Sequence, residues 1–345
     1  MSDRQVIATE LLKGQGLGNQ LFCYVTTRCL ALQNHCEFAI LNREILANNI
    51  HSNKGMYFMD IDCGLDMKKE EFSEIYQEKE DRIYLGNSMH DIEHGCYISG
   101  ADEKLLNLNQ SILVYGNMQD EAYFGQYKEE IKQWLKVKPE YDNYEYSRDN
   151  QCINNIRGGE YTSKPELFLR RKYWLDAMKV MRQKRSDMEF MVITDDLSAA
   201  KKILPEVPAY HFDLAGDYTA IKNAKYLILS NSTFAFFPAY TSETVQYIIA
   251  PKYWARHNVS DGYWASEQNI YDEFIYMDRK GNLFTAAECR EELAAYKQSS
   301  GRYHKAGIKL SGIRLLTAKC HAKYLICEDL FVRALRSVKR RISSN

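Results

Sequence analysis

The feature that most constrains this chain is its opening, where a short apolar segment runs into three closely spaced glycines. Residues 6–12 predict a strand, and Gly14, Gly16 and Gly18 follow it in a G-x-G-x-G turn. Apolar residues near helical spacing then predict a helix over 19–33, and residues 37–41 predict a second strand. A strand, a crossover helix and a second strand favour a parallel sheet that helices cover on both faces.

The same alternation of strands and helices returns in the second half of the chain and indicates a doubly wound α/β domain. A polar, turn-rich segment at residues 139–150 is the best linker between the two halves. The further predicted strands are 112–115, 152–156, 190–194, 211–214, 226–229 and 246–250, and the further predicted helices are 121–137, 172–184, 197–204, 218–224 and 233–241.

Composition and charge exclude several classes of protein. The 345 residues suggest about two domains, at roughly 150 residues each. A net charge of -1 argues against nucleic acid as the main partner. The nine cysteines show no CxxC spacing, which favours reduced thiols over a disulfide framework or a zinc ribbon. With no signal-like segment and no long apolar stretch, we expect a cytoplasmic protein without a membrane span.

The C-terminal segment is strongly basic from residue 302 onward. Two interpretations of it stay open. It forms a basic amphipathic helix on an anionic membrane surface, or a terminal helix that packs on the protein and exposes its basic face. The apolar residues on one helical stripe are Cys327, Phe331, Ala334, Leu335, Val338 and Ile342.

Polar residues follow several of the predicted strands, at the edge where open α/β sheets bind their ligands. The glycine turn presents backbone N–H groups and a positive helix end to an anion, and Ser232 and Thr233 form a second such cradle. Arg157 is suited to grip a diphosphate, and Glu160 is suited to act as a base or to bind a sugar hydroxyl. Taken singly, these features are also explained by a tight turn, a surface ion pair and a helix cap.

Two further hypotheses are a dinucleotide-binding dehydrogenase and a metal site. The glycine turn with Glu37 as a ribose-binding acid keeps a dehydrogenase open as an alternative. Asp60 and Asp62 form a D-x-D, but they lie far along the chain from the phosphate-binding candidates, so we do not expect them to hold a metal. The histidine spacings give no zinc site either, and the sequence therefore predicts no metal.

Five motifs in order resemble the α-1,2-fucosyltransferase family, glycosyltransferase family 11. The family's GGLGNQLFQY is matched by GQGLGNQLFCY at 14–24, and its GYxQsexYF by YGNMQDEAYF at 115–124. Its HxRRGDY corresponds to NIRGGEY at 155–161, its SDD to TDD at 194–196, and its NSTFSWW to NSTFAFF at 231–237. The resemblance covers about residues 5 to 290.

The resemblance implies a GT-B-type fold, in which two Rossmann-like domains face each other across a cleft that holds the site. The first domain, 1–145, would serve the acceptor, the second, 146–295, would bind a GDP-sugar, and 296–345 would be a basic helical tail. It also implies inversion at the sugar carbon, GDP-fucose as the donor and no cofactor. Arg157, Glu160 and Asn19 would act in catalysis. The donor would be bound by Gly16, Gly18, Asn19, Asn155, Arg157, Asp195, Asp196, Asn231, Ser232, Thr233 and Phe234, with Asp195 or Asp196 facing guanine.

Several positions depart from the family pattern. The family's histidine is Asn155 here, its second arginine is Gly158, and its aspartate is Glu160. Phe236 and Phe237 replace a tryptophan pair. These changes leave open a donor other than GDP-fucose, or a nucleotide-sugar-binding protein without catalysis. The expected acceptor is the galactose of an oligosaccharide or a lipid-linked glycan, such as an O-antigen unit.

Overall fold

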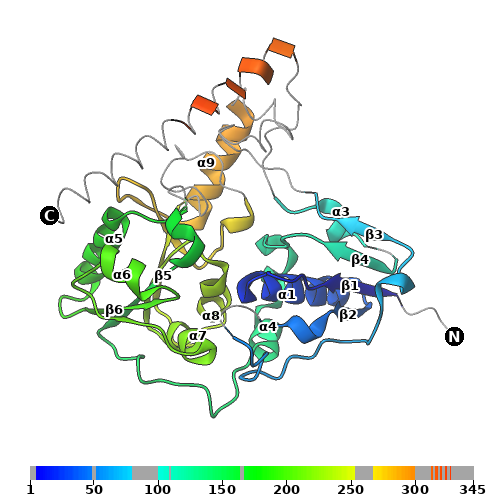
Figure 1. Ribbon diagram of the computed structural model, residues 1–345, viewed down its shortest axis with the longest axis horizontal. Coiled ribbons are helices and arrows are strands. Elements are labelled where there is room, and N and C mark those ends of the chain that lie inside the picture. The colour runs from blue at the N-terminus through cyan, green and yellow to red at the C-terminus, as the bar shows by residue number, and fades with distance from the viewer. Residues whose placement is uncertain are drawn as a thin grey trace.

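The computed structural model describes residues 5–48, 52–79, 100–108, 110–163, 167–252 and 267–299, with short pieces between 312 and 327. Within them the chain forms two α/β domains that lie side by side, each around its own largely parallel sheet (Figure 1). This confirms the α/β class and the two Rossmann-like domains that the sequence predicts.

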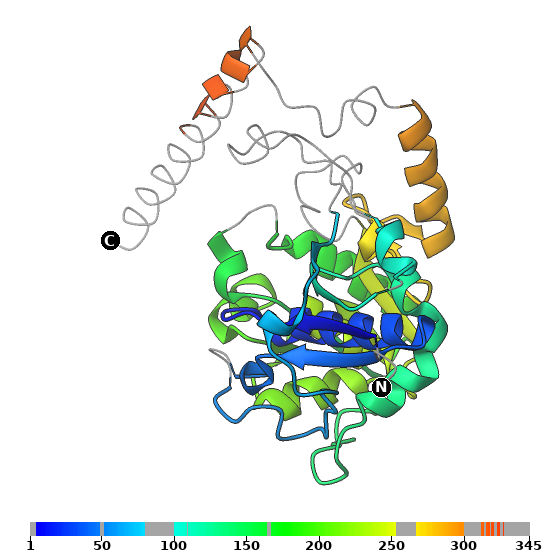
Figure 2. The same cartoon turned by 90° about the vertical axis from the view of Figure 1, so that its right-hand side faces the viewer.

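The first domain holds a four-stranded sheet in the order β2-β1-β4-β3, in which all neighbouring strands run parallel. α1 (Leu17–Gln33) connects β1 to β2 as the opening of the sequence predicts, and it lies behind these two strands in Figure 2. The strands are β1 (Val6–Glu10), β2 (Glu37–Leu41), β3 (Ile75–Gln77) and β4 (Ile112–Tyr115). The other α-helices among the described residues of this domain are α3 (Glu103–Leu106) and α4 (Lys128–Trp134).

The second domain holds a seven-stranded sheet in the order β11-β10-β9-β8-β5-β6-β7, parallel except between β10 and β11. The chain leaves β5 toward β6 on one side and later returns to β8 on the other, so the topological switch point lies between β5 and β8. The strands are β5 (Gln151–Ile156), β6 (Glu189–Thr194), β7 (Ala209–Tyr210), β8 (Tyr226–Leu229), β9 (Tyr247–Pro251), β10 (Ile275–Met277) and β11 (Leu283–Phe284). The α-helices that the structure describes here are α5 (Arg171–Lys184), α6 (Leu197–Ile203), α7 (Leu214–Lys222), α8 (Phe236–Tyr240) and α9 (Ala286–Ser299).

Four predicted elements are wrong in detail. The helix expected over 121–137 is two 3-10 turns, η3 (Glu121–Tyr123) and η4 (Gly125–Tyr127), followed by α4. Residues 211–213 form no strand, since β7 ends at Tyr210. The helix expected over 218–224 is α7, which begins at Leu214 because Asp213 caps it by accepting from Gly216 N–H at 2.9 Å. The helix expected over 233–241 begins as the 3-10 turn η6 (Thr233–Ala235), since Pro238 has no N–H to donate and fits only the first turn of α8.

Buried aromatic rings join the two domains. Phe22 on α1 lies 4.7 Å from Phe236 and 4.8 Å from Phe237 between ring centroids, and Tyr271 lies 4.1 Å from Phe236. Phe124, whose backbone leaves the helical conformation at φ -136°, adds its ring to the same cluster. Such tilted and stacked pairs stabilise beyond their buried area. The Phe236–Phe237 pair therefore fills the core between the domains and does not line the donor cavity described below.

The connection between the sheets runs from the end of α4 to the start of β5, and the predicted domain boundary between residues 145 and 146 falls within it. That boundary stays a prediction, as does the tail over 296–345. α9 extends past residue 296, where the tail is expected to begin. Of the apolar stripe predicted for the tail, only Cys327 is among the described residues. None of the described helices combines the length and the apolar character that crossing a bilayer requires.

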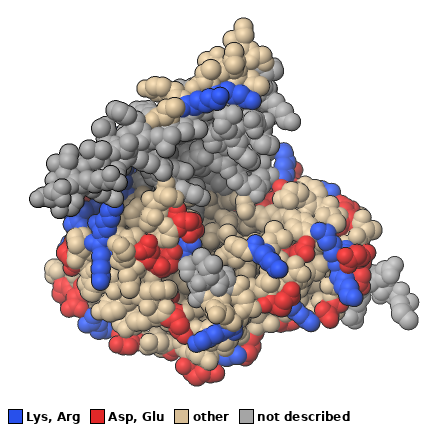
Figure 3. All heavy atoms as spheres, in the orientation of Figure 1, with Lys and Arg blue, Asp and Glu red and all other residues tan. Residues whose placement is uncertain are grey.

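Acidic and basic side chains are interspersed over the described part of the face in Figure 3, without a field of one sign. This agrees with the net charge of -1. The described cysteines are free thiols, and Cys96 lies outside the described residues.

Candidate active site

A cavity of about 530 Å³ opens where the carboxyl ends of strands from both sheets meet. Open α/β sheets bind ligands at this edge, next to the switch point, because loops of opposite crossover direction separate there and leave a crevice. The residues lining it are Gly14, Gly16, Leu17, Gly18, Asn19, Asn155, Ile156, Arg157, Glu160, Tyr161, Ile193, Thr194, Asp195, His211, Leu214, Asp217, Ser232, Thr233 and Phe234.

The wall from the first domain is the glycine turn and the start of α1. Gly16 is the N-cap residue, with an extended backbone and no side chain to cap the helix. The first N–H groups of a helix have no hydrogen-bond partner within the helix and carry its positive end. Because the first residues of α1 line the cavity, this positive end faces it. A Cβ at Gly18 would lie 2.2 Å from the carbonyl carbon of Thr233, so only glycine allows α1 to approach the second domain this closely.

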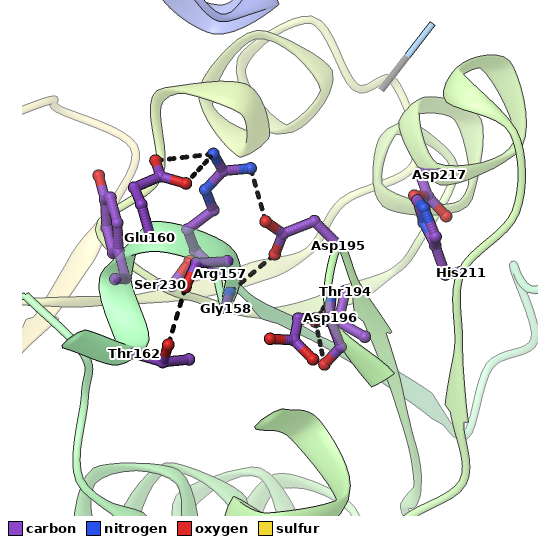
Figure 4. A network of polar contacts seen from close by, with 12 residues as sticks. Arg157, Gly158, Glu160, Thr162, Thr194, Asp195, Asp196, His211, Asp217 and Ser230 are labelled. Carbon is purple, nitrogen blue, oxygen red and sulfur yellow. Dashed lines mark hydrogen bonds and ion pairs between the residues drawn. The ribbon is translucent and has the colours of Figure 1, made fainter. Parts of the chain in front are cut away.

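The centre of the opposite wall is Arg157, which follows β5 and is held by two carboxylates (Figure 4). Its Nη2 donates to both oxygens of Glu160 at 2.8 and 3.0 Å, and its Nη1 lies 2.8 Å from Oδ2 of Asp195. Burial acts to lower the pKa of Arg157, but Asp195 and Glu160 outweigh it and raise that pKa. The guanidinium therefore stays charged. The exposed fraction is 20% for the Arg157 side chain, 10% for Asp195 and 52% for Glu160.

Two of the positions that depart from the family pattern, Asn155 and Gly158, lie beside Arg157 and have defined contacts there. Asn155 accepts from Ser230 Oγ at 3.2 Å and donates to the carbonyl of Ile193 at 3.4 Å, so its amide ties β5 to both adjacent strands. A Cβ at Gly158 would lie 2.4 Å from Cβ of Asp196, which leaves no room there for a second arginine. Gly158 N–H instead donates to Asp195 at 2.7 Å.

Two of the predicted donor residues do not line the cavity. Asp196 caps α6 by accepting from Ala199 N–H at 2.9 Å, beneath the Gly158 turn. Asn231 is 3% exposed, and its side-chain amide has no hydrogen-bond partner in the part of the chain that the structure describes. Its backbone carbonyl accepts from Tyr161 at 3.4 Å. Every other predicted residue is brought together here by the fold.

The third wall is the loop after β8. Ser232 is the N-cap residue of η6 but makes no capping hydrogen bond, so its hydroxyl is not committed to the helix. Ser232, Thr233 and Phe234 all line the cavity. This loop and the Arg157 loop flank the switch point between β5 and β8.

A histidine–aspartate pair that sequence reasoning missed lies away from the Arg157 cluster (Figure 4). Nδ1 of His211 is 2.8 Å from Oδ2 of Asp217, and Phe212 N–H donates to Oδ1 at 2.9 Å. Burial raises the pKa of Asp217 to about 6, opposed by the hydrogen bonds from Phe212 and His211. No spacing in the sequence marks the pair, because it forms only once α7 begins at Leu214.

The alternatives based on Glu37 and on the D-x-D are not supported. Glu37 is the first residue of β2 and pairs with Val6, at the end of the sheet opposite to the cavity. A ribose-binding acid would have to lie at the carboxyl end. Asp60 pairs with Lys138 at 2.8 Å and Asp62 with Arg28 at 3.6 Å, and neither lines the cavity.

Comparison with known proteins identifies the same family that the sequence motifs resemble. The model of the family described as glycosyl transferase family 11 matches residues 66–278, which include the Arg157 and Ser232 loops. An alpha-1,2-colitosyltransferase of Escherichia coli is 24% identical over 265 residues, covering 69% of this chain and 89% of the relative.

Among solved structures, NodZ alpha-1,6-fucosyltransferase soaked with GDP-fucose is similar at a TM-score of 0.42 and 10% identity, over 82% of this chain and 99% of that one. Its form co-crystallised with GDP gives a TM-score of 0.41 and 11% identity, over 82% and 98% of the two chains. The family model matches more than half of the residues of this chain, which therefore belongs to glycosyl transferase family 11.

Proposed function

We propose that the protein transfers L-fucose from GDP-fucose to a hydroxyl group of a sugar acceptor, with inversion and without a metal ion. The observation that carries the proposal is the cavity itself, in which a charged arginine faces the positive end of α1. A guanidinium and free helix N–H groups are the groups that bind a diphosphate.

The proposed reaction is a single displacement. The acceptor oxygen forms a bond to the sugar's anomeric carbon while the bond from that carbon to the diphosphate oxygen breaks. Negative charge then grows on the leaving GDP. Arg157, the N-terminal amides of α1 and the hydroxyls of Ser232 and Thr233 stabilise it more than they stabilise the bound donor. Glu160, more than half exposed at the cavity, takes the proton of the acceptor hydroxyl.

Guanine is assigned to Asp217 in place of Asp195 or Asp196. A carboxylate can accept from N1–H and N2–H of guanine together. Asp195 is paired with Arg157, beside the groups proposed to bind the diphosphate, and Asp196 lies outside the cavity. Asp217 is a cavity-lining carboxylate apart from the phosphate-binding groups. The contact between Nδ1 of His211 and Oδ2 of Asp217 holds this carboxylate in place.

The acceptor and the cell location are part of the proposal. We expect α-1,2 linkage to galactose in a surface glycan or an O-antigen unit, made in the cytoplasm, with a basic tail available for contact with the membrane surface. The colitosyltransferase relative favours one alternative, in which GDP-colitose replaces GDP-fucose as the donor. A chain that binds a GDP-sugar without transferring it is the other alternative.

Thermal unfolding with single ligands in EDTA tests the donor. The panel contains GDP, GDP-fucose, GDP-colitose, GDP-mannose, UDP-galactose and NAD. A ligand that binds only the folded state at 100 times its dissociation constant adds about 2.7 kcal/mol to the unfolding free energy. Stabilisation by GDP and GDP-fucose supports the proposal, and a preference for GDP-colitose changes the sugar. No effect of any guanosine ligand overturns it.

A further inference from the structure

A row of three side-chain amides connects the second domain to the start of α1. Nδ2 of Asn269, in η7 (Glu267–Asn269), donates to Oε1 of Gln119 at 3.3 Å. Nε2 of Gln119 then donates to Oδ1 of Asn19 at 3.2 Å. Gln119 lies in the loop after β4, the strand next to β1, so the parallel topology of the first sheet brings it beside α1. Of the three amides, only Asn19 lines the cavity.

The row has a direction, because an amide donates from its nitrogen and accepts at its oxygen. Asn269 offers an N–H, so Gln119 turns its oxygen toward Asn269 and its nitrogen toward Asn19. Asn19 must then present its oxygen to Gln119. Its Nδ2 is left over, and no side chain or carbonyl in the described ranges accepts from it. The NH2 group of Asn19 is therefore available to donate a hydrogen bond to a ligand in the cavity.

Both distant members of the row are anchored by buried tyrosines. The hydroxyl of Tyr271 donates to the backbone carbonyl of Gln119 at 3.2 Å and lies 3.5 Å from Nδ2 of Asn269. The hydroxyl of Tyr276 donates to the backbone carbonyl of Asn269 at 3.0 Å. Tyr271 and Tyr276 are each 1% exposed. Because the Tyr271 hydroxyl donates its one proton to the Gln119 carbonyl, it can only accept from Asn269, so the NH2 group of Asn269 points toward Tyr271 and Gln119. This contact between the two domains fixes the direction of the row.

We propose that Gln119 and Asn269 are positioning residues that hold the amide of Asn19 with its NH2 toward the diphosphate of the donor. The proposal rests on the proposed function, since it assumes that a nucleoside diphosphate occupies the cavity. The anion is placed there by the N–H groups of α1 on one side and by Arg157 on the other. A third donor pointing inward completes a preorganised set around it.

The test is Gln119→Glu, which replaces a side chain that both donates and accepts by one that only accepts. Asn19 must then turn its NH2 to the new carboxylate and its oxygen to the cavity. We expect at least about 10-fold weaker GDP binding in calorimetry, the usual effect of losing a hydrogen bond to a charged group, and unchanged binding of guanosine, which lacks phosphates. Gln126→Glu is the control, since Gln126 is exposed and its amide reaches Gln33 at 3.5 Å.

A double variant separates the amide from the added charge. If Gln119→Glu acts through Asn19, it weakens GDP binding little further in an Asn19→Ala background. An equal loss in both backgrounds means direct charge repulsion and overturns the proposal, as does wild-type GDP binding by Gln119→Glu. A loss of guanosine binding along with GDP also overturns it. A wild-type protein that binds no GDP refutes the proposed function instead.

Asn269→Asp provides an independent variant in case Gln119→Glu does not fold. An aspartate at this position accepts from Nε2 of Gln119, which reverses the row and again turns the oxygen of Asn19 inward. The new charge is then two amides away from the cavity. The same loss for GDP, with guanosine unaffected, is expected, and unchanged GDP affinity in this folded variant contradicts the proposal.

Discussion

Glu160→Gln separates the contact of Glu160 with Arg157 from its proposed role as the catalytic base. The carboxylate binds Nη2 of Arg157 through both oxygens, at 2.8 and 3.0 Å, so it competes with a diphosphate for the guanidinium. It is also the proposed base. Removing its charge should therefore change donor binding and turnover in opposite directions.

The magnitudes follow from exposure. Glu160 is 52% exposed, and an exposed ion pair contributes about 0.2–1 kcal/mol. Freeing Arg157 should therefore tighten GDP binding by about fivefold at most. Loss of a general base lowers turnover by about 10²–10⁴-fold. Calorimetry with GDP gives the first quantity, and kcat at saturating GDP-fucose and acceptor gives the second.

The matched control is Glu206→Gln. Glu206 forms a similar paired contact with Arg171, at 2.8 and 3.1 Å, and its side chain is 45% exposed, but it lies outside the cavity. Both variants should lose similar stability, and only Glu160→Gln should lose turnover. Wild-type kcat in Glu160→Gln refutes the base assignment. A parallel loss of GDP affinity and kcat would mean that Glu160 mainly orients Arg157.

Three further results are expected. Arg157→Ala should lower kcat by at least about 100-fold in a folded protein, and a wild-type rate would remove Arg157 from the mechanism. Asp217→Asn should weaken GDP binding and flatten the pH dependence of stability. Because burial raises the pKa of Asp217 to about 6, the folded state retains a proton that the unfolded state releases. Wild-type stability therefore falls as pH rises through about 4 to 6, and an unchanged melting profile would contradict this. Activity should be complete in EDTA, and a loss that manganese restores would return attention to Asp60 and Asp62.

Much of the candidate site could be predicted from the sequence because its parts are local. A strand, a glycine turn and a helix start are encoded within 20 consecutive residues, and each loop that follows a parallel strand reaches the same edge of its sheet. Local signals therefore place Arg157, Ser232 and Thr233 at the edge of one sheet and the glycine turn at the edge of the other. The motifs added the resemblance to a family, and the family match over residues 66–278 confirms that family.

Tertiary structure decided what those residues do there. Asp195 and Asp196 are adjacent in sequence, yet one binds Arg157 and the other caps α6, because successive side chains at the end of a strand point in opposite directions. Asp217 lines the cavity only because α7 begins four residues earlier than its apolar pattern predicts. Element boundaries depend on capping geometry, which Asp213 supplies here.

The sequence by itself determined the two α/β domains and the strand ends that carry the chemistry, since apolar periodicity and glycine placement are local signals. Only the tertiary structure decided how the domains meet. Phe236 and Phe237 pack on Phe22, and Asn269 reaches Gln119 across 150 residues of chain, which no local pattern encodes. Contacts of that length depend on the docking of two complete cores, so the orientation of Asn19 became visible only in the folded molecule.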